Sequence, residues 1–354
     1  MIESTTSLPP FDHERVETAV GPRSGLTITA ALHSSVLGPA LGGCRVWTYP
    51  TWLDSVSDAL RLASAMTMKN AAAGLNAGGG KSVIRLAPGE TLDADRRTAA
   101  LLDLGDVVEH FEGRYLTAED VGTSAEDMLV VARRTAHVVG LPATAGGTGD
   151  PSGPTSIGVL AGLGATLRAL YGTDQFEGRS FVVAGLGHVG TRIAARLAAE
   201  GGVVTVTDVD PGKRRVADSL GARWVEPDEA HTVEADVFVP SGVGGVLTET
   251  VIRELGARAV VGPANNPLAD RAGADLLHDS GVLYAPDFVV NAGGAIYLTL
   301  AAAGVDGREI DRRLEGIGDT VSRVYEDAAA AGTTPLVAAE ELAFARLRGE
   351  RVNA

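Results

Sequence analysis

Residues 179–208 read RSFVVAGLGHVGTRIAARLAAEGGVVTVTD, and this stretch decides the fold of the second half of the chain. An apolar strand over 179–184 runs into a GLGHVG turn, a helix follows over 191–200, and a second strand ends at Asp208. This order is typical of dinucleotide binding, because backbone N–H groups and the helix N-terminus hold a pyrophosphate while the acidic residue accepts from ribose hydroxyls. The sequence therefore predicts an NAD site made by Gly185, Gly187, His188, Val189, Gly190 and Asp208.

Two alternatives stay open for this stretch. Glycines also form tight turns for purely structural reasons. Asp208 and Asp210 would repel the 2′-phosphate of NADP and so favour NAD, but the basic run 213–215 follows closely in the sequence.

Three further strands are expected over 235–239, 259–261 and 282–284, which would complete one open parallel sheet. Ligands bind beyond the carboxyl ends of such strands. The loops 262–267 and 288–294 are therefore expected to face the cofactor or the substrate, and they contain Asn265, Asn266 and Asn291. The alternative for these asparagines is turn formation and helix capping.

The first half of the chain contains two lysines in unusual surroundings. Lys69 follows Met66, Thr67 and Met68, Lys81 follows three glycines, and no carboxylate occurs between Arg61 and Glu90. Apolar surroundings and a second cation disfavour a charged ammonium, so one lysine is suited to exchange protons while the other holds an anion. The alternative is a glycine-rich turn between a helix and a strand, with both lysines reaching to water.

Asp120 is the expected acid/base partner of these lysines, because it follows a strand predicted over 115–118. The alternative is an acidic residue at the N-terminus of the helix predicted over 123–134. The other expected elements are a hairpin within 14–33, a Gly/Pro turn over 38–45, helices over 51–66 and 93–111, a strand over 82–86, and an interdomain connection over 143–151.

Composition limits the classes of function. A length of 354 residues exceeds one typical core, so two domains are expected, and a net charge of −15 without a basic stripe argues against a nucleic-acid partner. The single cysteine, Cys44, excludes an intrachain disulfide and favours a reducing, cytoplasmic compartment. No histidine spacing indicates a metal site, no segment indicates a membrane span, and Met1–Pro10 does not have the pattern of a signal peptide.

Seven motifs in order resemble the Glu/Leu/Phe/Val amino-acid dehydrogenase family, and most closely its bacterial phenylalanine dehydrogenases. They are GPALGGCR (38–45), AMTMKNAAAG (65–74), GGGKSVI (78–84), TAEDVGT (117–123), GLGHVG (185–190), GPANNPLAD (262–270) and YAPDFVVNAGGAIYL (284–298). The resemblance implies that Lys69 binds the substrate carboxylate, that Lys81 is the catalytic base, and that Asp120 assists proton transfer. It also implies that Asn265 and Asn266 lie near the substrate and the nicotinamide, with Thr155 and Asn291 around the nicotinamide. The segment 149–155, GDPSGPT, departs from many members, which have Pro-Val before this threonine.

The same resemblance implies an apolar substrate pocket. Glutamate-specific members place a lysine and a serine where this chain has Leu41 and Leu298, while Met66 and Ala295 complete the lining beside Gly42 and Gly43. The expected substrate is a large apolar L-amino acid, phenylalanine first, with leucine, valine or tryptophan as alternatives.

Together these observations predict a two-domain α/β fold with the active site in the cleft. Residues 1–147 form a substrate-binding and oligomerisation domain, residues 148–326 a Rossmann-type doubly wound parallel-sheet domain, and residues 327–354 helices that return to the first domain. The implied reaction is reversible NAD-dependent deamination to a 2-oxo acid and ammonium, in a homo-oligomer of two or more copies. Two competing classes stay open. One is a 2-oxo acid reductase, although such enzymes usually use a His and Arg pair and the only histidine in these motifs is His188 in the phosphate loop. The other is a non-catalytic NAD-binding protein.

Overall fold

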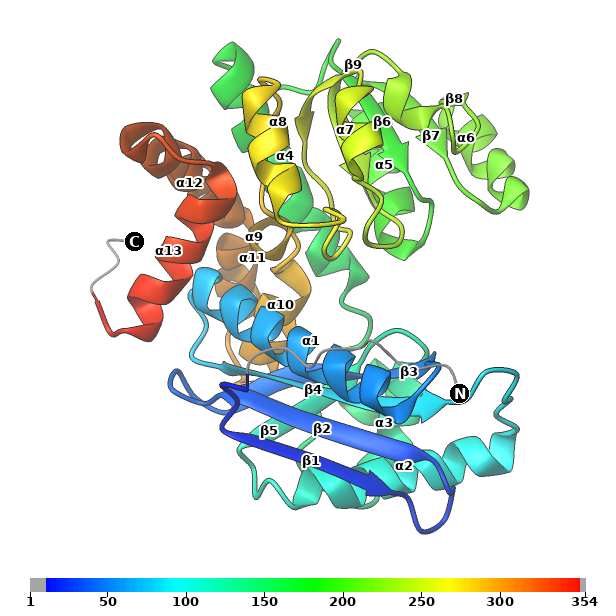
Figure 1. Ribbon diagram of the computed structural model, residues 1–354. Helices are drawn as coiled ribbons and strands as arrows, with labels where there is room; N and C mark the ends of the chain where they lie inside the picture. Colours follow the sequence, from blue (N-terminus) through cyan, green and yellow to red (C-terminus); the bar gives the residue numbers. More distant parts are fainter. Residues whose placement is uncertain (1–10, 351–354) are drawn as a thin grey trace. The chain divides into compact units, whose positions relative to one another are not determined.

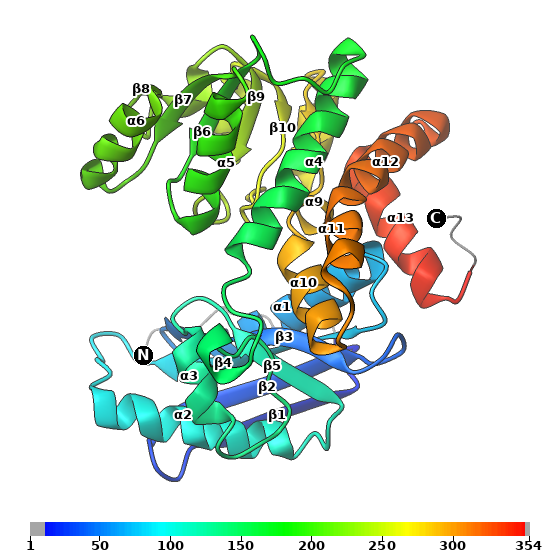
Figure 2. The same cartoon turned by 180° about the vertical axis from the view of Figure 1, so that it is seen from behind.

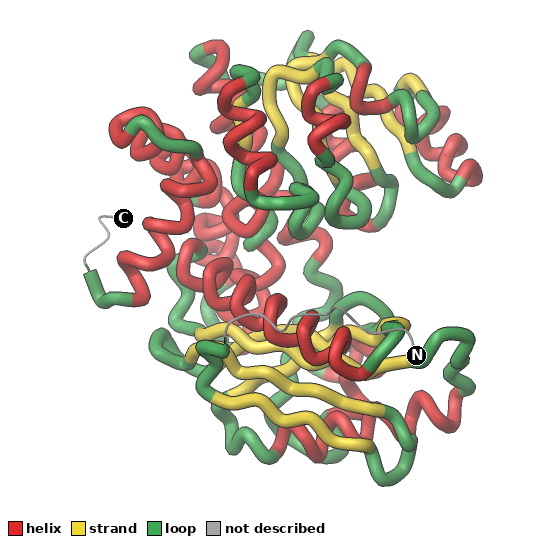
Figure 3. Tube along the Cα trace, in the orientation of Figure 1, coloured by secondary structure: helices red, strands yellow, loops and turns green. Residues whose placement is uncertain are grey.

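The computed structural model describes residues 11–350 and consists of two α/β units, each built on its own sheet (Figures 1, 2 and 3). Among the described residues, the first unit runs to Asp150 and also contains Leu298–Gly304 and 346–350, while the second contains Pro151–Tyr297 and Val305–Ala345. The boundary predicted after residue 147 lies just before this division. Of the predicted returning segment 327–354, only the part from Arg346 belongs to the first unit, and the contribution of Leu298–Gly304 was not predicted. Met1–Pro10 and residues 351–354 lie outside the described residues.

The sheet of the first unit has the strand order β1-β2-β4-β3-β5. Its strands are β1 (Arg15–Val20), β2 (Thr27–Ser34), β3 (Ala40–Thr48), β4 (Gly78–Leu86) and β5 (Tyr115–Glu119). The first two form the predicted antiparallel hairpin, whereas β3 runs parallel to both β4 and β5. Because Cys44 on β3 pairs with Ser82 on one side and Glu119 on the other, Lys81 and Asp120 each lie one residue from this level, close enough for their side chains to meet across β3.

Helices cover both faces of this sheet (Figures 1 and 2). Helix α1 (Trp52–Ala72) packs on one face, where Ala31 and Val83 point, and α2 (Ala94–Glu109) and α3 (Ala125–Val131) pack on the other, where Ile28 and Ile84 point. A capping box between Thr51 and Asp54 begins α1. The helix continues beyond the predicted end at residue 66, so Lys69 lies in its last turn.

Gly42 and Gly43 lie in β3 and Gly78–Gly80 lie in β4, which corrects the prediction of a turn over 38–45 from Ala40 onward and the alternative of a turn before Lys81. A Cβ at Gly42 would overlap the Gly80 carbonyl, and a Cβ at Gly79 would lie 2.6 Å from the Ala63 carbonyl oxygen and closer still to Thr67 on α1. The glycines therefore allow β3, β4 and α1 to pack closely, because any side chain would force these elements apart.

The second sheet is entirely parallel and has the order β11-β10-β9-β6-β7-β8. Its strands are β6 (Ser180–Ala184), β7 (Val203–Thr207), β8 (Arg223–Trp224), β9 (Ala235–Pro240), β10 (Ala257–Val260) and β11 (Leu283–Tyr284). This is the doubly wound Rossmann order, in which the order of successive strands across the sheet reverses between β6 and β9. The predicted fold class is confirmed, although the two-residue strand β8 was not predicted.

Helices flank the second sheet on both sides, with α4 and α5 on one face and α7 and α8 on the other (Figures 1 and 2). The helices of this part are α4 (Ser152–Tyr171), α5 (His188–Ala199), α6 (Arg214–Leu220), α7 (Glu249–Arg253), α8 (Ala272–Asp279), α9 (Asp287–Val290), α10 (Gly293–Ala302), α11 (Gly307–Glu315), α12 (Ile317–Ala331) and α13 (Pro335–Leu347). Within residues 11–350, no helix is both long and apolar enough to cross a membrane.

Candidate active site

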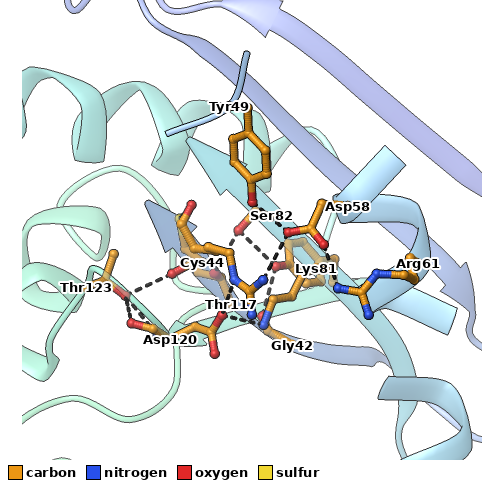
Figure 4. Close-up of polar contacts among 12 residues, drawn as sticks. Gly42, Cys44, Tyr49, Asp58, Arg61, Lys81, Ser82, Thr117, Asp120 and Thr123 are labelled. Atoms are coloured by element: carbon orange, nitrogen blue, oxygen red, sulfur yellow. Dashed lines mark hydrogen bonds and ion pairs between the residues drawn. The ribbon is translucent and has the colours of Figure 1, made fainter. Parts of the chain in front are cut away.

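Lys81 and Asp120 meet in the first unit (Figure 4). Lys81 Nζ lies 2.7 Å from Asp120 Oδ2, and the Lys81 side chain is only 6% exposed. The Asp120 backbone N–H donates to Thr123 Oγ1 at 2.9 Å, and Thr123 in turn donates to the Cys44 carbonyl, which fixes the chain just after β5. A lysine and a carboxylate in contact, with little access to water, can exchange a proton with a bound substrate.

The charge of Asp120 is set by its neighbours. Burial by itself raises the pKa of the Asp120 carboxyl, but the Lys81 ammonium and the Arg45 guanidinium outweigh burial and hold this pKa below its usual value. Arg45 Nε lies 3.4 Å from Asp120 Oδ2, so two cations share one oxygen. Asp120 is therefore ionised at neutral pH.

Lys69 is held by the packing of α1 on β4. Thr67 lies against Gly79, and the Asn70 side-chain amide donates to the Gly78 carbonyl at 2.6 Å. These contacts lie on either side of Lys69 in the sequence and join the end of α1 to the start of the strand that carries Lys81.

The loop after β6 has the geometry of a pyrophosphate site. Gly185 has φ +114°, and a Cβ there would lie 2.8 Å from the Gly242 backbone nitrogen. A Cβ at Gly190 would overlap the Gly185 carbonyl, whereas one at Gly187, the N-cap of α5, would meet open space. Gly185 thus allows the tight turn, Gly190 allows the helix to pack closely, and Gly187 leaves free access to the N-terminus of α5, where His188 and Val189 begin the helix. This arrangement fits the pyrophosphate of NAD.

Asp208 lies at the edge of this loop. Its carboxylate accepts from the Leu186 N–H at 2.6 Å and from the Asp210 N–H at 2.8 Å, which leaves lone pairs for the ribose hydroxyls. Arg214, in the basic run that left NADP open, is engaged by Glu226 and by the Trp224 ring at 5.1 Å. These contacts favour NAD over NADP.

A second polar group lies in the same unit. The Asn291 side-chain amide donates to Asn265 Oδ1 at 3.0 Å and to the Pro263 carbonyl at 3.2 Å. Its own Oδ1 is buried and has no hydrogen-bond partner among the described residues, so it can accept from a bound carboxamide. Thr155 lies beside the glycines that follow Asn291, since its Oγ1 would be 2.9 Å from a Cβ at Gly294. Asn266 has φ +48° and its N–H donates to Asp287 at 2.8 Å. The structure thus brings together Asn265, Asn291 and the segment around Thr155.

The predicted specificity residues belong to both units. Leu41, Met66 and Leu298 are in the first unit and Ala295 is in the second. Leu41 and Leu298 are 4% and 7% exposed, and Leu298 packs 3.5 Å from a Cβ position at Gly140. Gly42 and Gly43 lie in the middle of β3, and a Cβ at Gly43 would be 2.8 Å from Asp120 Cβ. Gly43 therefore keeps space beside Asp120.

The sequence did not predict the residues that support Asp120 and Asn266. Arg45, Asp58 and Tyr49 form a hydrogen-bonded network next to Asp120, and Asp287 fixes the backbone of Asn266. Arg45 ends the GPALGGCR motif, which was the available signal, but Asp58 lies on α1 and has no motif around it. No group of three or more His, Cys, Asp or Glu residues suited to a metal ion occurs in the described part of the chain.

A Rossmann unit with a complete dinucleotide loop, joined to an α/β unit with a lysine and aspartate pair, defines a nicotinamide-dependent dehydrogenase. Comparison with known proteins gives the family. Residues 15–137 match the Glu/Leu/Phe/Val dehydrogenase dimerisation domain, and residues 212–353 match the Glutamate/Leucine/Phenylalanine/Valine dehydrogenase domain. The chain belongs to the Glu/Leu/Phe/Val dehydrogenase family and is an NAD-dependent amino-acid dehydrogenase.

Several relatives match nearly end to end. Leucine dehydrogenase of Bacillus cereus is 39% identical over 338 residues, which cover 95% of this chain and 91% of that protein. Phenylalanine dehydrogenase of Lysinibacillus sphaericus is 35% identical over 348 residues, covering 97% and 90%. Among solved structures, L-tryptophan dehydrogenase from Nostoc punctiforme has a TM-score of 0.81 at 33% identity and 96% coverage of both chains. A hetero-hexameric glutamate dehydrogenase from Thermus thermophilus has a TM-score of 0.79 at 25% identity, covering 95% of this chain and 89% of that one.

Proposed function

We propose that this enzyme reversibly deaminates a large apolar L-amino acid, phenylalanine first, to its 2-oxo acid and ammonium. The observation that carries the proposal is the 2.7 Å contact between Lys81 Nζ and Asp120 Oδ2, in a chain that also has a complete dinucleotide loop. A reductase acting on a hydroxy acid has no ammonium to deprotonate, and a binding protein has no need of a buried proton-exchanging pair.

The proposed mechanism begins with Lys69, which holds the substrate carboxylate. The α-ammonium must then lose a proton, because hydride leaves the α-carbon only when the nitrogen lone pair is free. Lys81 in its neutral form takes this proton, and ionised Asp120 stabilises the ammonium that Lys81 becomes. NAD, when bound, supplies the hydride acceptor.

Lys81 acts a second time after hydride transfer. It first releases to solvent the proton taken from the α-ammonium, and it then removes a proton from the water that attacks the imine carbon. Lys81 returns that proton to the nitrogen, and the hydroxyl proton passes to the departing ammonia as the carbinolamine collapses to the 2-oxo acid and ammonium. Asn265 is assigned to the substrate, and Asn266, Asn291 and Thr155 to the nicotinamide side. The buried, unpaired Oδ1 of Asn291 supports this assignment, because a carboxamide NH₂ could donate to it.

The choice of substrate rests on Leu41, Leu298 and Ala295. A glutamate side-chain carboxylate against two leucines would be buried without a partner, which costs several kcal/mol. Ala295 leaves more space than the valine that leucine- and valine-specific members tend to carry, and this favours phenylalanine. Leucine is the second candidate, because leucine dehydrogenases reach 39% identity with this chain.

The test is a panel of L-amino acids with NAD at alkaline pH, assayed with the wild type, Lys81→Ala and Lys69→Ala. Lys81→Ala is expected to lower kcat by at least about 10²-fold while NAD binding stays intact. Lys69→Ala is expected mainly to raise the Michaelis constant for the amino acid. A loss of NAD affinity above about tenfold in Lys81→Ala, or 1.4 kcal/mol, contradicts the assignment.

We also propose a homo-oligomer of two or more copies. The match of residues 15–137 to a dimerisation domain supports this proposal, as does the prevalence of closed symmetric assemblies among enzymes. Light scattering on the protein as it elutes from a size-exclusion column measures the number of copies, and a monomer at assay concentration would contradict the proposed oligomer.

A further inference from the structure

Arg45 joins the catalytic pair to a second carboxylate (Figure 4). Arg45 lies on β3. Its Nε is 3.4 Å from Asp120 Oδ2, and its Nη1 is 3.0 Å from Asp58 Oδ2 on α1. A planar guanidinium can bridge two acids in this way, whereas a lysine ammonium at the same place has no rigid fork. The orientation of Arg45 therefore depends on Asp58 as well as on Asp120.

Asp58 is itself firmly held. Tyr49 donates to Asp58 Oδ2 at 2.6 Å, and Arg61 Nη2 lies 2.7 Å from Oδ1. Burial raises the pKa of the Asp58 carboxyl, but its bonds from Tyr49, Arg61 and Arg45 outweigh burial and lower it. Burial and the bond to Asp58 raise the pKa of Tyr49, so its hydroxyl stays a donor. This group has a fixed geometry and a fixed charge at the pH of the reaction.

We propose that Asp58 is a positioning residue for the reaction, which holds Arg45 against Asp120 and so fixes the carboxylate that faces Lys81. The inference rests on the proposed function, because it assigns Arg45 and Asp58 to the support of the Lys81 and Asp120 pair. Neither residue needs to touch the substrate. Their effect is on the proton affinity and the orientation of the pair.

The pH–rate profile reports this effect. The charged and titratable groups around Asp120 are Lys81 from β4, Arg45 and the buried Cys44 from β3, Tyr115 from β5, Asp58 and Arg61 from α1, and Asp127 from α3. In Arg45→Gln one of the two cations next to Asp120 is lost, so the acidic limb of kcat/KM is expected to move to higher pH by about one unit. Arg45→Lys keeps the charge and is expected to restore most of this shift with a lower kcat.

The direction in which Asp58→Asn moves the acidic limb of kcat/KM distinguishes two ways in which Asp58 could act. If Asp58 acted only through space, removing its negative charge would favour ionised Asp120 and move the acidic limb to lower pH. If Asp58 holds Arg45, its loss frees the guanidinium from Asp120 and moves the limb to higher pH. The matched control is Arg168→Gln, which also removes an arginine bond to an aspartate, Asp174, but is half exposed and belongs to the second unit. It is expected to leave the limb and kcat unchanged.

The experiment measures kcat, KM and the pH profile of these variants with NAD and the best amino acid, with thermal melting as a check of folding. A shift to higher pH in both Arg45→Gln and Asp58→Asn, with the Michaelis constant for NAD unchanged, supports the inference. A wild-type profile or a shift to lower pH in Asp58→Asn overturns it, even if Arg45→Gln does not fold. Asp120→Asn separates the two proposals. If this variant retains wild-type activity, the proposed function of the Lys81 and Asp120 pair is wrong. If it is inactive while Asp58→Asn has the wild-type pH profile, only the proposed role of Asp58 is refuted.

Discussion

Gly79→Ala tests whether the close approach of α1 to β4 places Lys69. The added Cβ would lie 2.6 Å from the Ala63 carbonyl oxygen and still closer to the backbone nitrogen and Oγ1 of Thr67. Ordinary van der Waals contact begins at 3.4 Å, so α1 must move by at least 3.4 − 2.6 = 0.8 Å. Overpacking of this kind costs about 1–3 kcal/mol, which lowers the Tm of a unit of this size by roughly 2–12 °C.

The displacement also reaches the site, because Lys69 lies two residues after Thr67 on the same helix. A misplacement of about 1 Å can cost about 10²-fold in rate, so the Michaelis constant for the amino acid is expected to rise and kcat to fall. NAD affinity should not change, since the dinucleotide loop belongs to the other unit. Steady-state kinetics, calorimetry and NAD titration measure these effects. The matched control is Gly307→Ala, whose Cβ meets open space. If Gly79→Ala melts and turns over like this control, the packing argument is wrong.

Three further predictions concern the cofactor, the pocket and acid stability. Asp208→Ala is expected to narrow the preference for NAD over NADP, because the 2′-phosphate is no longer repelled; a wild type that already prefers NADP would refute this charge argument. Ala295→Val is expected to lower kcat/KM for phenylalanine relative to valine by a factor within about 10–200, the range for a methylene-scale change; an improvement for phenylalanine would contradict it. Burial raises the pKa of the Asp127 carboxyl, but the two bonds from Arg97 outweigh burial and lower this pKa below 3.8. The contribution of Asp127 to stability is therefore present above pH 3.8 and is lost as the pH falls through the lowered pKa. Asp127→Asn should therefore flatten the fall of unfolding free energy with acid, and an unchanged slope would exclude this role.

Most strands and the dinucleotide loop of the second unit could be predicted from the sequence, because their signals are local. All the signals for the dinucleotide loop lie in one continuous stretch from β6 to Asp208. They are a buried strand, a turn that needs glycine, a helix and an acidic residue at the end of the next strand. Among the described strands of this unit only β8 was missed, because two residues give no periodicity, whereas the helices α6, α7 and α8 were not predicted.

The first unit was harder to predict because its glycines serve contacts that are distant in the sequence. Glycine clusters usually indicate turns, yet Gly42 lies in a strand because its missing side chain admits the Gly80 carbonyl. The contact of Lys81 with Asp120 agrees with the partnership expected from the sequence, whereas their catalytic roles stay predictions. The support of Asp120 by Arg45 and Asp58 could not be predicted, because it joins β3, α1 and β5 through side chains 75 and 13 positions apart.

The most direct measurement is the rate of NADH oxidation with an apolar 2-oxo acid, such as phenylpyruvate, as ammonium is raised from zero. The reverse of the proposed reaction consumes ammonium, so we expect no oxidation in its absence and a saturating rise with concentration that Lys81→Ala lacks. Oxidation that proceeds equally well without ammonium would contradict the account and indicate a 2-oxo acid reductase. Tight NADH binding without turnover at any ammonium concentration, across the panel of apolar 2-oxo acids, would instead indicate a binding protein.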